Sequence, residues 1–380
     1  MLDALATALP TRGATARSTA ALLNNPGCVR RAVLDAARVD LGGIASMLGA
    51  PTQFGQSPFA LGQGNRFEQR VKAEGYSALV ASVNELLGIF DDMETLRTVN
   101  LDRVATGNRS LIEARADATA DVLVAIATGA EDAPHVVDHG VTTLEVGGTR
   151  VFLEQDALAF REGEHLRICE VKGFPIIDGR ADPEKVGAAA RQTAVYLASI
   201  QDTLAARNLD PSVVSDEVIL ICPRNFSVQP VAARVDVSRE LRALRRQLRR
   251  RAEIGALVGA VEATAMAAGV DMNSLVSRLD ASGEDTGLIV SRLVEELPYA
   301  YAPACLSACD LGRHCRNCAE AADDPRRLGG AVVDLVPADA SVSAVISLAD
   351  DPTPPPEVAE VAVLLSSARR ALVEARRVAS

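Results

Sequence analysis

The sequence predicts an α/β fold, in which a mixed β-sheet core is flanked by helices and followed by a helical region rich in cysteine. Between residues 141 and 172, β-branched and apolar residues alternate with polar ones, as in strands. Helical periodicity surrounds this stretch on both sides. The segment "SDEVILICPRNF" at 215–226 is a short apolar run, which is typical of a strand buried inside a sheet.

The alternating stretch predicts three strands joined by tight turns, at 141–146, 149–160 and 165–172. The Gly147-Gly148 pair marks the first turn, and "EGE" at 162–164 marks the second. A helix follows, with Asp182 as its predicted N-cap and Pro183 at its first position. Strands followed by a helix and a further apolar strand indicate a mixed sheet.

The remaining chain is predicted to be largely helical. Helical patterns cover residues 1–50, where a turn precedes a helix beginning near Cys28, and about 77–130. A long helix holds seven arginines, and helix continues to about residue 297; the arginines are Arg239, Arg242, Arg245, Arg246, Arg249, Arg250 and Arg251. We expect these arginines to neutralise phosphates of a nucleic acid, the alternative being a solvated surface helix.

The last fifty residues form a separate segment. "AVVDLVP" and "SAVISLA" suggest short strands, "DPTPPPE" a stiff linker, and 357–378 an amphipathic helix that we expect to bind a protein partner. The sequence thus divides into an N-terminal helical region, a core, a helical region with the arginines and cysteines, and a C-terminal extension, at 1–62, 63–230, 231–325 and 326–380.

Composition limits the function classes. The chain has 380 residues, 48% of them hydrophobic, a formal net charge of −11, and only 3% aromatics. It is therefore not a generic binder of polyanions, and it lacks the aromatics to hold a nucleic acid mainly by stacking. Because no signal peptide or membrane-length apolar run is visible, we expect a soluble cytoplasmic protein. In that reducing compartment, clustered cysteines indicate metal ligands.

Three charged residues point to metal-assisted chemistry. Glu170 and Lys172 share one face of a predicted strand, and a hairpin about 162–164 would place Asp156 roughly opposite Glu170. Two carboxylates brought together favour a cation between them, and oxygen ligands suit Mg²⁺ or Mn²⁺. Lys172 would orient a metal-activated water or stabilise transition-state charge. The alternative is a solvated Glu–Lys pair on a strand.

This order of elements resembles the RecB-like branch of the PD-(D/E)XK nucleases, whose fold is restriction-endonuclease-like. The resemblance covers about residues 20–320 and implies a catalytic set of Asp156, Glu170, Lys172, Gln192 and Tyr196. It also implies that Gln192 and Tyr196 help to hold the substrate backbone and the lysine. Glu68, in "GQGNRFEQR", matches the upstream metal ligand beside Asp156 and Glu170, with His135 and His139 as competitors.

Cysteines are concentrated in "ACLSACDLGRHCRNCAEA", and the layout resembles the iron–sulfur members of the same family. These include the AddB nuclease domain and the iron–sulfur nuclease of CRISPR spacer acquisition. The resemblance implies a 4Fe–4S cluster on Cys28, Cys305, Cys309 and Cys315. The first downstream interval is x3 where the family usually has x2, and Cys318 offers a fifth thiol. A local zinc site, C-x3-C-x5-C-x2-C, is the alternative.

Together these features predict a metal-dependent deoxyribonuclease acting on single strands or ends of DNA; an exonuclease is the expected type, and endonucleolytic cleavage is left open. The resemblance implies a place in DNA repair, recombination or phage defence. Two alternatives remain open: a catalytically inactive nucleic-acid-binding or scaffolding subunit, and a zinc-stabilised interaction protein.

Overall fold

The computed structural model divides the chain into two compact units. One unit comprises Met1–Thr11, Asn24–Phe54 and Leu257–Ser380, and the other comprises Arg12–Leu23 and Gly55–Ala256. We call them the helical unit and the sheet unit. The structure describes residues 1–13, 15–51, 58–88, 97–108, 110–146, 149–155, 158–162, 165–225, 227–281, 286–328, 332, 336–337 and 340–379.

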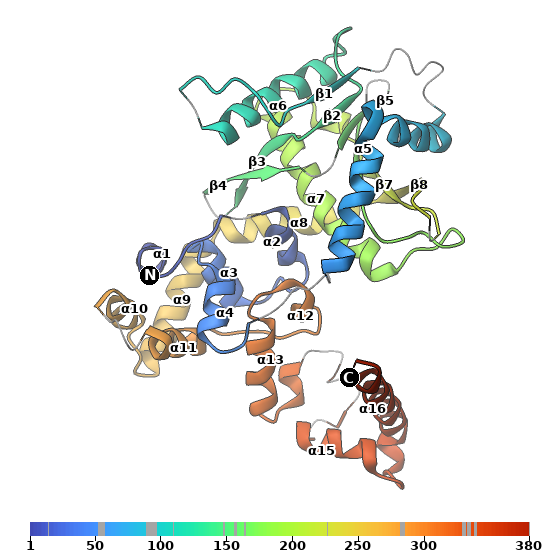
Figure 1. Cartoon of the computed structure of the whole chain (residues 1–380). Coiled ribbons are helices and arrows are strands. Elements are labelled where there is room, and N and C mark those ends of the chain that lie inside the picture. Colours follow the sequence, from blue (N-terminus) through green and yellow to red (C-terminus); the bar gives the residue numbers. More distant parts are fainter. Residues whose placement is uncertain are drawn as a thin grey trace. The chain divides into compact units, whose positions relative to one another are not determined.

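The sheet unit is built on a six-stranded mixed sheet with the strand order β1-β2-β5-β6-β7-β8 (Figure 1). β2 pairs antiparallel with β5, β5 antiparallel with β6, and β6 parallel with β7. The strands are β1 (Thr98–Asn100), β2 (Val136–Asp138), β5 (Leu158–Glu162), β6 (His165–Val171), β7 (Glu217–Pro223) and β8 (Pro230–Asp236). The predicted β5–β6 hairpin and the predicted apolar strand inside the sheet are therefore confirmed.

Helices cover both faces of this sheet. α5 (Pro58–Leu87) packs on the face that carries Val136 and Cys169, whereas α7 (Pro183–Ala205) packs on the face that carries Ile168. α6 (Leu111–Ala127) and α8 (Ser238–Ala252) join α7 around the larger core. Because neighbouring strand residues point to opposite faces, this arrangement fixes which polar side chains meet which helix.

The predicted strand at 149–160 is wrong in one respect, because the chain forms two strands that belong to different sheets. β4 (Thr149–Glu154) pairs with β3 (Val141–Val146) in a separate two-stranded sheet, and β5 pairs with β2 and β6. Buried Gln155 ends β4: its backbone N–H donates to the Gly140 carbonyl, and its side chain donates to Thr142. The helical prediction for 77–130 also fails at β1, which pairs in parallel with β2.

The helical unit brings the amino-terminal helices together with the cysteine-rich segment. Its helices include α1 (Leu2–Ala8), α3 (Val29–Ala36), α4 (Leu41–Met47), α10 (Met272–Ala281), α11 (Thr286–Glu296), α12 (Cys305–Ala308) and α13 (Gly312–Ala321). Gly312 allows a tight turn from α12 to α13, because a Cβ at this position would collide with the carbonyl of Cys305.

The end of the chain is helical where a strand was expected. "SAVISLA" forms α15 (Val342–Ser347), capped by Ser341, whose side chain accepts from the Ala344 backbone N–H. α16 (Ala359–Ala379) confirms the final helix and exposes Val363 and Leu372 among other apolar side chains. In the described residues, no single helix is both long and apolar enough to span a membrane; one pair bent by 99° passes that test jointly, Ile254–Ala267 with Met272–Leu279.

Candidate active site

A chain of polar contacts joins β6 to α7 inside the sheet unit. Lys172 Nζ lies 2.5 Å from Glu170 Oε1 and donates to Gln192 Oε1 at 2.9 Å. Gln192 Nε2 in turn donates to the Tyr196 hydroxyl at 3.1 Å. Four of the residues expected to be catalytic are therefore brought together, and the ammonium of Lys172 is held from two directions.

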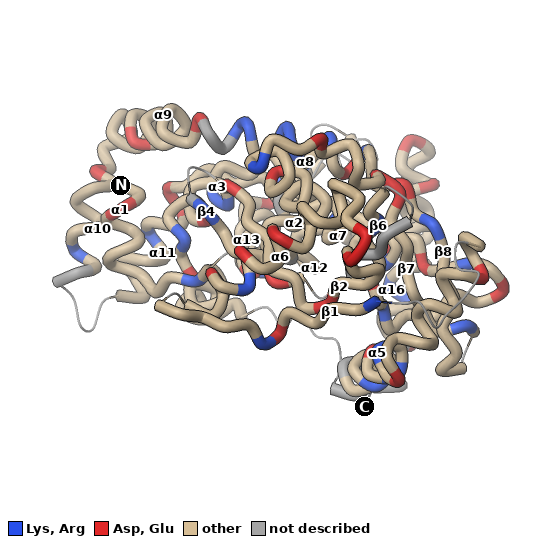
Figure 2. The backbone as a smooth tube through the Cα atoms, turned by 90° about the horizontal axis from the view of Figure 1, so that it is seen from above, with Lys and Arg blue, Asp and Glu red and all other residues tan. Residues whose placement is uncertain are grey.

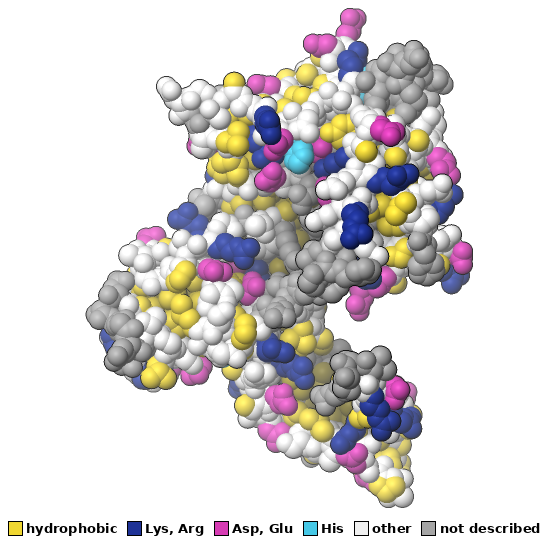
Figure 3. Space-filling model, in the orientation of Figure 1, with side chains coloured by type: hydrophobic (Ala, Val, Ile, Leu, Met, Phe, Trp, Pro, Cys, Tyr) yellow, Lys and Arg dark blue, Asp and Glu magenta, His cyan; other side chains and the backbone are white. Residues whose placement is uncertain are grey.

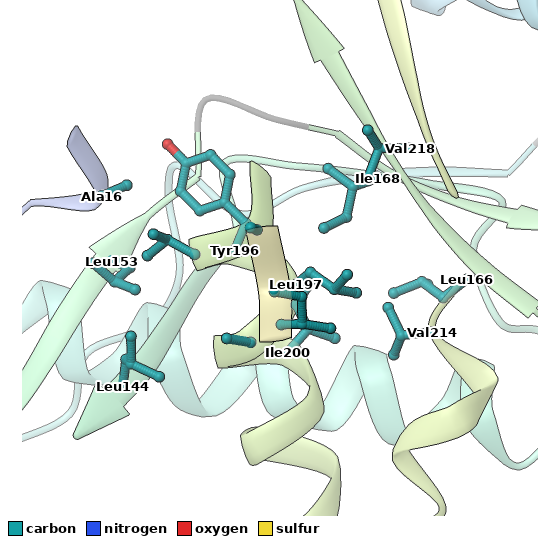
Figure 4. Close-up of a cluster of buried hydrophobic side chains, with 14 of the residues drawn as sticks. Ala16, Leu144, Leu153, Leu166, Ile168, Tyr196, Leu197, Ile200, Val214 and Val218 are labelled. Carbon is teal, nitrogen blue, oxygen red and sulfur yellow. The ribbon is translucent and has the colours of Figure 1, made fainter. Parts of the chain in front are cut away.

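Local sequence explains how α7 presents its two residues. Asp182 caps the helix by accepting from the Glu184 N–H at 2.9 Å, as the sequence predicts, and Pro183 occupies its first position. Gln192 and Tyr196 are four residues apart and so share one helix face. Tyr196 is only 1% exposed, and its ring lies beside Leu153 in the hydrophobic cluster of Figure 4. Packing in the hydrophobic core thus fixes Tyr196, the last residue in the chain of polar contacts.

Glu170 is a buried carboxylate, with 1% of its surface exposed. A buried charge of this kind needs a partner, and Lys172 supplies one. Asp156, expected to share the metal with Glu170, lies outside the described residues. The flanking strands are described, and their register pairs Leu158 with Cys169.

A second buried carboxylate, which the sequence analysis missed, lies at the end of β2. Asp138 is 1% exposed and receives hydrogen bonds from Lys72 Nζ at 3.0 Å, the Tyr76 hydroxyl at 2.8 Å and the His139 backbone N–H at 2.9 Å. Its sequence signal is an acidic residue directly after a short apolar run in "HVVDHG". The contact with Tyr76 depends on a break in α5, where Glu74, Gly75 and Tyr76 have positive φ.

The expected metal ligand Glu68 belongs to this second group. Its carboxylate lies 2.9 Å from Lys72 Nζ, so Lys72 bridges Glu68 and Asp138. Burial lowers the pKa of Lys72, but these two carboxylates outweigh burial and raise the pKa above its usual value. Burial and Asp138 together raise the pKa of Tyr76. The group is therefore an internally balanced ion-pair network.

The two buried carboxylates lie on opposite faces of the sheet. Asp138 shares a face with Val136 and contacts α5, whereas Glu170 shares a face with Ile168 and is linked to α7 through Lys172. The start of α5 nevertheless comes close to the end of β6, since a Cβ at Gly173 would lie 2.9 Å from Gly64 Cα. This approach needs a glycine at position 173, whereas a Cβ at Gly64 would meet nothing within 4 Å; it brings the first part of α5 beside the residue that follows Lys172.

His135 and His139, the alternatives to Glu68 as a metal ligand, contact other groups. His135 Nδ1 accepts the Arg97 backbone N–H at 3.1 Å. His139 Nε2 lies 3.7 Å from Asp138 Oδ2. Neither contact involves Glu170.

The ion pair between Lys72 and Asp138 yields a stability prediction. Lys72→Met should lower the free energy of unfolding by about 3 kcal/mol, because it leaves a buried carboxylate without its cation. Urea denaturation of the purified variant measures this change. Glu68→Gln is the matched control: it removes the exposed partner of the same lysine and should cost at most about 1 kcal/mol. Equal losses in the two variants would contradict a dominant role for the buried pair.

In the helical unit, four cysteines from distant parts of the sequence lie in one region. Cys28 precedes α3, whose Arg30 donates its backbone N–H to the Pro298 carbonyl at 2.7 Å. The Arg30 guanidinium donates to Cys315 Sγ at 3.2 Å. Asn25 Nδ2 donates to Cys305 Sγ at the same distance. The segment around Cys28 is therefore joined to the downstream cysteines.

Burial and neighbouring charges set the state of these thiols. Burial raises the pKa of Cys315 to about 12, opposed by Arg30; the charges of Cys309 and Cys28 raise it further. Burial also raises the pKa of Cys309, opposed by Arg31. Cys318 differs, because its sulfur lies 3.5 Å from His314 Nε2. Cys169 and Cys222 lie elsewhere, fully buried in β6 and β7.

Across the described ranges, no three His, Cys, Asp or Glu side chains converge closely enough to hold one metal ion. A tetrahedral zinc needs such convergence, with Zn–S bonds of about 2.3 Å. In a 4Fe–4S cluster each thiolate binds a different iron, so its four ligands stand farther apart. Cys28, Cys305, Cys309 and Cys315 are of the ligand type that iron–sulfur clusters use, and Asn25 and Arg30 join the segment around Cys28 to the sulfurs of Cys305 and Cys315.

Comparisons with known proteins add no relative. No family model matches the chain, and neither curated proteins nor solved structures gave a match.

Proposed function

We propose that this chain is a metal-dependent deoxyribonuclease, acting as an exonuclease on single strands or ends of DNA. The observation that carries the proposal is the linked set Glu170, Lys172, Gln192 and Tyr196. A lysine held 2.5 Å from a buried carboxylate and 2.9 Å from a helix glutamine is an oriented ammonium group. The mixed sheet with helices on both faces supports the restriction-endonuclease-like assignment.

The proposed chemistry divides tasks among these residues. Glu170 and Asp156 would hold Mg²⁺ or Mn²⁺, and Glu68 would join them as a further ligand on leaving its ion pair with Lys72; the ion would polarise the phosphate and acidify a bound water. Lys172 orients the attacking water, which releases a proton to solvent as its oxygen forms a bond to phosphorus, and the ammonium stabilises the charge on the phosphate. The opposite P–O bond then breaks, and the departing oxygen takes a proton from solvent. Gln192 and Tyr196 keep the lysine in place.

A structural 4Fe–4S cluster is the second part of the proposal. Cys28, Cys305, Cys309 and Cys315 would hold it, because they lie together in the helical unit. When bound, the cluster supplies a covalent link between segments far apart in sequence. Such a link reduces the entropy of the open chain and so stabilises the fold. Hydrolysis itself needs only the residues of the sheet unit.

The exposed arginines of α8 support DNA as the substrate. Figure 2 shows several basic positions along this helix, and Figure 3 shows acidic and basic side chains interspersed over one face of the molecule. Arg245 turns inward and donates to the Ala198 carbonyl and to Gln201 of α7. Four exposed arginines follow one stripe at helical spacing, Arg239, Arg242, Arg246 and Arg249.

The stripe of four arginines is long enough to contact several phosphates of a DNA strand. Ten residues of helix separate its ends, which corresponds to about 15 Å. Arg245 joins α8 to α7 through a hydrogen bond, and α7 carries Gln192, which contacts Lys172. The arginine stripe and the contacts of Lys172 therefore belong to one packed body. DNA bound along α8 would thus be held by the unit that cuts it.

The stripe predicts a measurable salt dependence. Arg246→Gln/Arg249→Gln should reduce the slope of log affinity against log salt by about 0.7 per arginine for single-stranded DNA, and hence by about 1.4. Fluorescence anisotropy of a labelled oligonucleotide, with EDTA to prevent cleavage, measures the slope. Arg103→Gln/Arg207→Gln removes two exposed arginines of the same unit outside α8 and should leave the slope unchanged. Identical slopes in both double variants would exclude α8 as the surface that binds the DNA phosphates.

The proposed activity is tested directly on end-labelled substrates. Full-length protein, purified without oxygen, is incubated with Mg²⁺ or Mn²⁺ and with single- or double-stranded DNA labelled at the 5′ or the 3′ end. Stepwise shortening from one end is expected, and EDTA should stop it. Absence of cleavage with every substrate and both metals would favour the inactive nucleic-acid-binding alternative.

A further inference from the structure

The segment from Asn25 to Arg31 directs hydrogen-bond donors at three cysteine sulfurs. Asn25 Nδ2 donates to Cys305 Sγ and Arg30 Nη1 donates to Cys315 Sγ, both at 3.2 Å. The Arg31 side chain also hydrogen-bonds to Cys309. The same segment contains Cys28. One short stretch therefore contributes a candidate ligand and a donor to each of the other three.

These donors carry buried positive charge. Arg30 is 1% exposed and Arg31 is 7% exposed. Arg31 is balanced by Asp35, whose Oδ2 lies 2.8 Å from its Nε. Arg30 instead donates to the Leu297 carbonyl at 3.1 Å and lies 4.3 Å from the centre of the Tyr299 ring. No carboxylate in the described part of the chain forms an ion pair with Arg30.

A buried guanidinium without an anion is costly, so an anion is expected at this place. The atom that Arg30 contacts is a sulfur, and a neutral thiol gives no charge compensation. Four thiolates around a 4Fe–4S core, or around zinc, carry a net negative charge. The position of Arg30 is therefore explained if Cys315 is a metal-bound thiolate in the working protein.

We propose that Arg30, assisted by Arg31 and Asn25, is a positioning residue that supplies the counter-charge for a thiolate-ligated metal centre and sets its reduction potential. The inference rests on the proposed cofactor and goes beyond it, because it assigns the residues that retain the centre. Hydrogen bonds to sulfur and nearby positive charge favour the more negative, reduced state of an iron–sulfur cluster. Loss of Arg30 should therefore lower the potential.

The experiment compares full-length wild type with Arg30→Met, Arg30→Lys and Arg313→Gln, all purified without oxygen. Arg313 is an exposed arginine of α13 and serves as the control. Iron and sulfide per chain, the rate of iron loss to a chelator and the midpoint potential are measured. For Arg30→Met we expect about tenfold faster iron loss and about tenfold weaker preference for the reduced state, equivalent to about 59 mV. Arg30→Lys should fall between Arg30→Met and wild type, and Arg313→Gln should match wild type.

The melting temperature of the metal-free protein distinguishes the counter-charge role from a purely structural one. If Arg30 serves only the bound centre, metal-free Arg30→Met should melt at the same temperature as metal-free wild type or higher, because an uncompensated buried charge has gone. A purely structural arginine would instead lower the melting temperature of both forms. That result, or an unchanged potential and iron-loss rate in Arg30→Met, would overturn the counter-charge role.

Failure of the cofactor proposal is recognised separately. If wild type holds zinc, the cluster is excluded, and chelator-driven zinc release from Arg30→Met and wild type tests the counter-charge in the same way. If Arg30→Met does not fold, the potential and metal-loss rate of Arg30→Lys decide the question. Wild type that binds neither iron nor zinc overturns both proposals.

Discussion

Glu170→Gln is expected to abolish metal-dependent DNA cleavage, with a loss of at least about 100-fold. This is the upper end of what loss of an outer-shell partner costs a metal site, and Glu170 is proposed as a direct ligand. The substitution keeps the shape of the side chain but removes the charge that would bind the cation and that holds Lys172 Nζ at 2.5 Å. Single-turnover cleavage of end-labelled DNA, with Mg²⁺ and with Mn²⁺, measures the effect.

The matched control for this result is Glu217→Gln. Glu217 is also a strand glutamate paired with a cation, since its Oε2 lies 2.9 Å from Arg167 Nη1. It begins β7, which lies next to β6 in the sheet, and has no proposed catalytic role. We expect cleavage close to wild type in this variant and matching circular dichroism spectra in both. Full activity of a folded Glu170→Gln protein would exclude the assignment.

Cys28→Ala should remove most of the iron and destabilise the protein, although Cys28 is far in sequence from Cys305. Three thiolates would remain around an open coordination site, and the link between α3 and the α12–α13 segment would be lost. Iron and sulfide analysis, with the visible absorption of anaerobic preparations, measures the cluster. A fall in Tm of several degrees is expected, since about 1 kcal/mol corresponds to about 2–4 °C in a domain of 150–250 residues.

Cys318→Ala separates the cluster from a local zinc site. Cys318 contacts His314, whereas Asn25, Arg30 and Arg31 contact the sulfurs of the other three downstream cysteines. A cluster on Cys28 predicts that Cys318→Ala keeps its iron. A colourless protein that loses zinc in Cys318→Ala but keeps it in Cys28→Ala would show that the downstream cysteines form a zinc site by themselves.

Local patterns in the sequence are sufficient for the features that depend on near neighbours. Alternation predicts β6 and its hairpin with β5, because residues two apart share a face and a hairpin pairs adjacent segments. Asp182 and Pro183 predict the start of α7, because capping involves only the first helical turn. The spacing of Gln192 and Tyr196 places both on one helix face. These positions are therefore readable without the rest of the chain.

Other features depend on partners far apart in the sequence, and only the tertiary structure decides them. The split of the predicted strand 149–160 arises because β4 and β5 find partners in different sheets. Asp138 becomes a buried ion-pair residue only when α5 brings Lys72 and Tyr76 to the end of β2.

The same distinction applies to the candidate sites. The sequence by itself determined the residue types: a Glu-x-Lys strand, a helix with Gln and Tyr four apart, and cysteines concentrated near the end of the chain. Only the tertiary structure joined Lys172 to Gln192 and buried Arg30 against Cys315. The physical reason is that burial and electrostatic pairing act through space between segments, whereas strand alternation and helix capping act between residues that are neighbours along the chain.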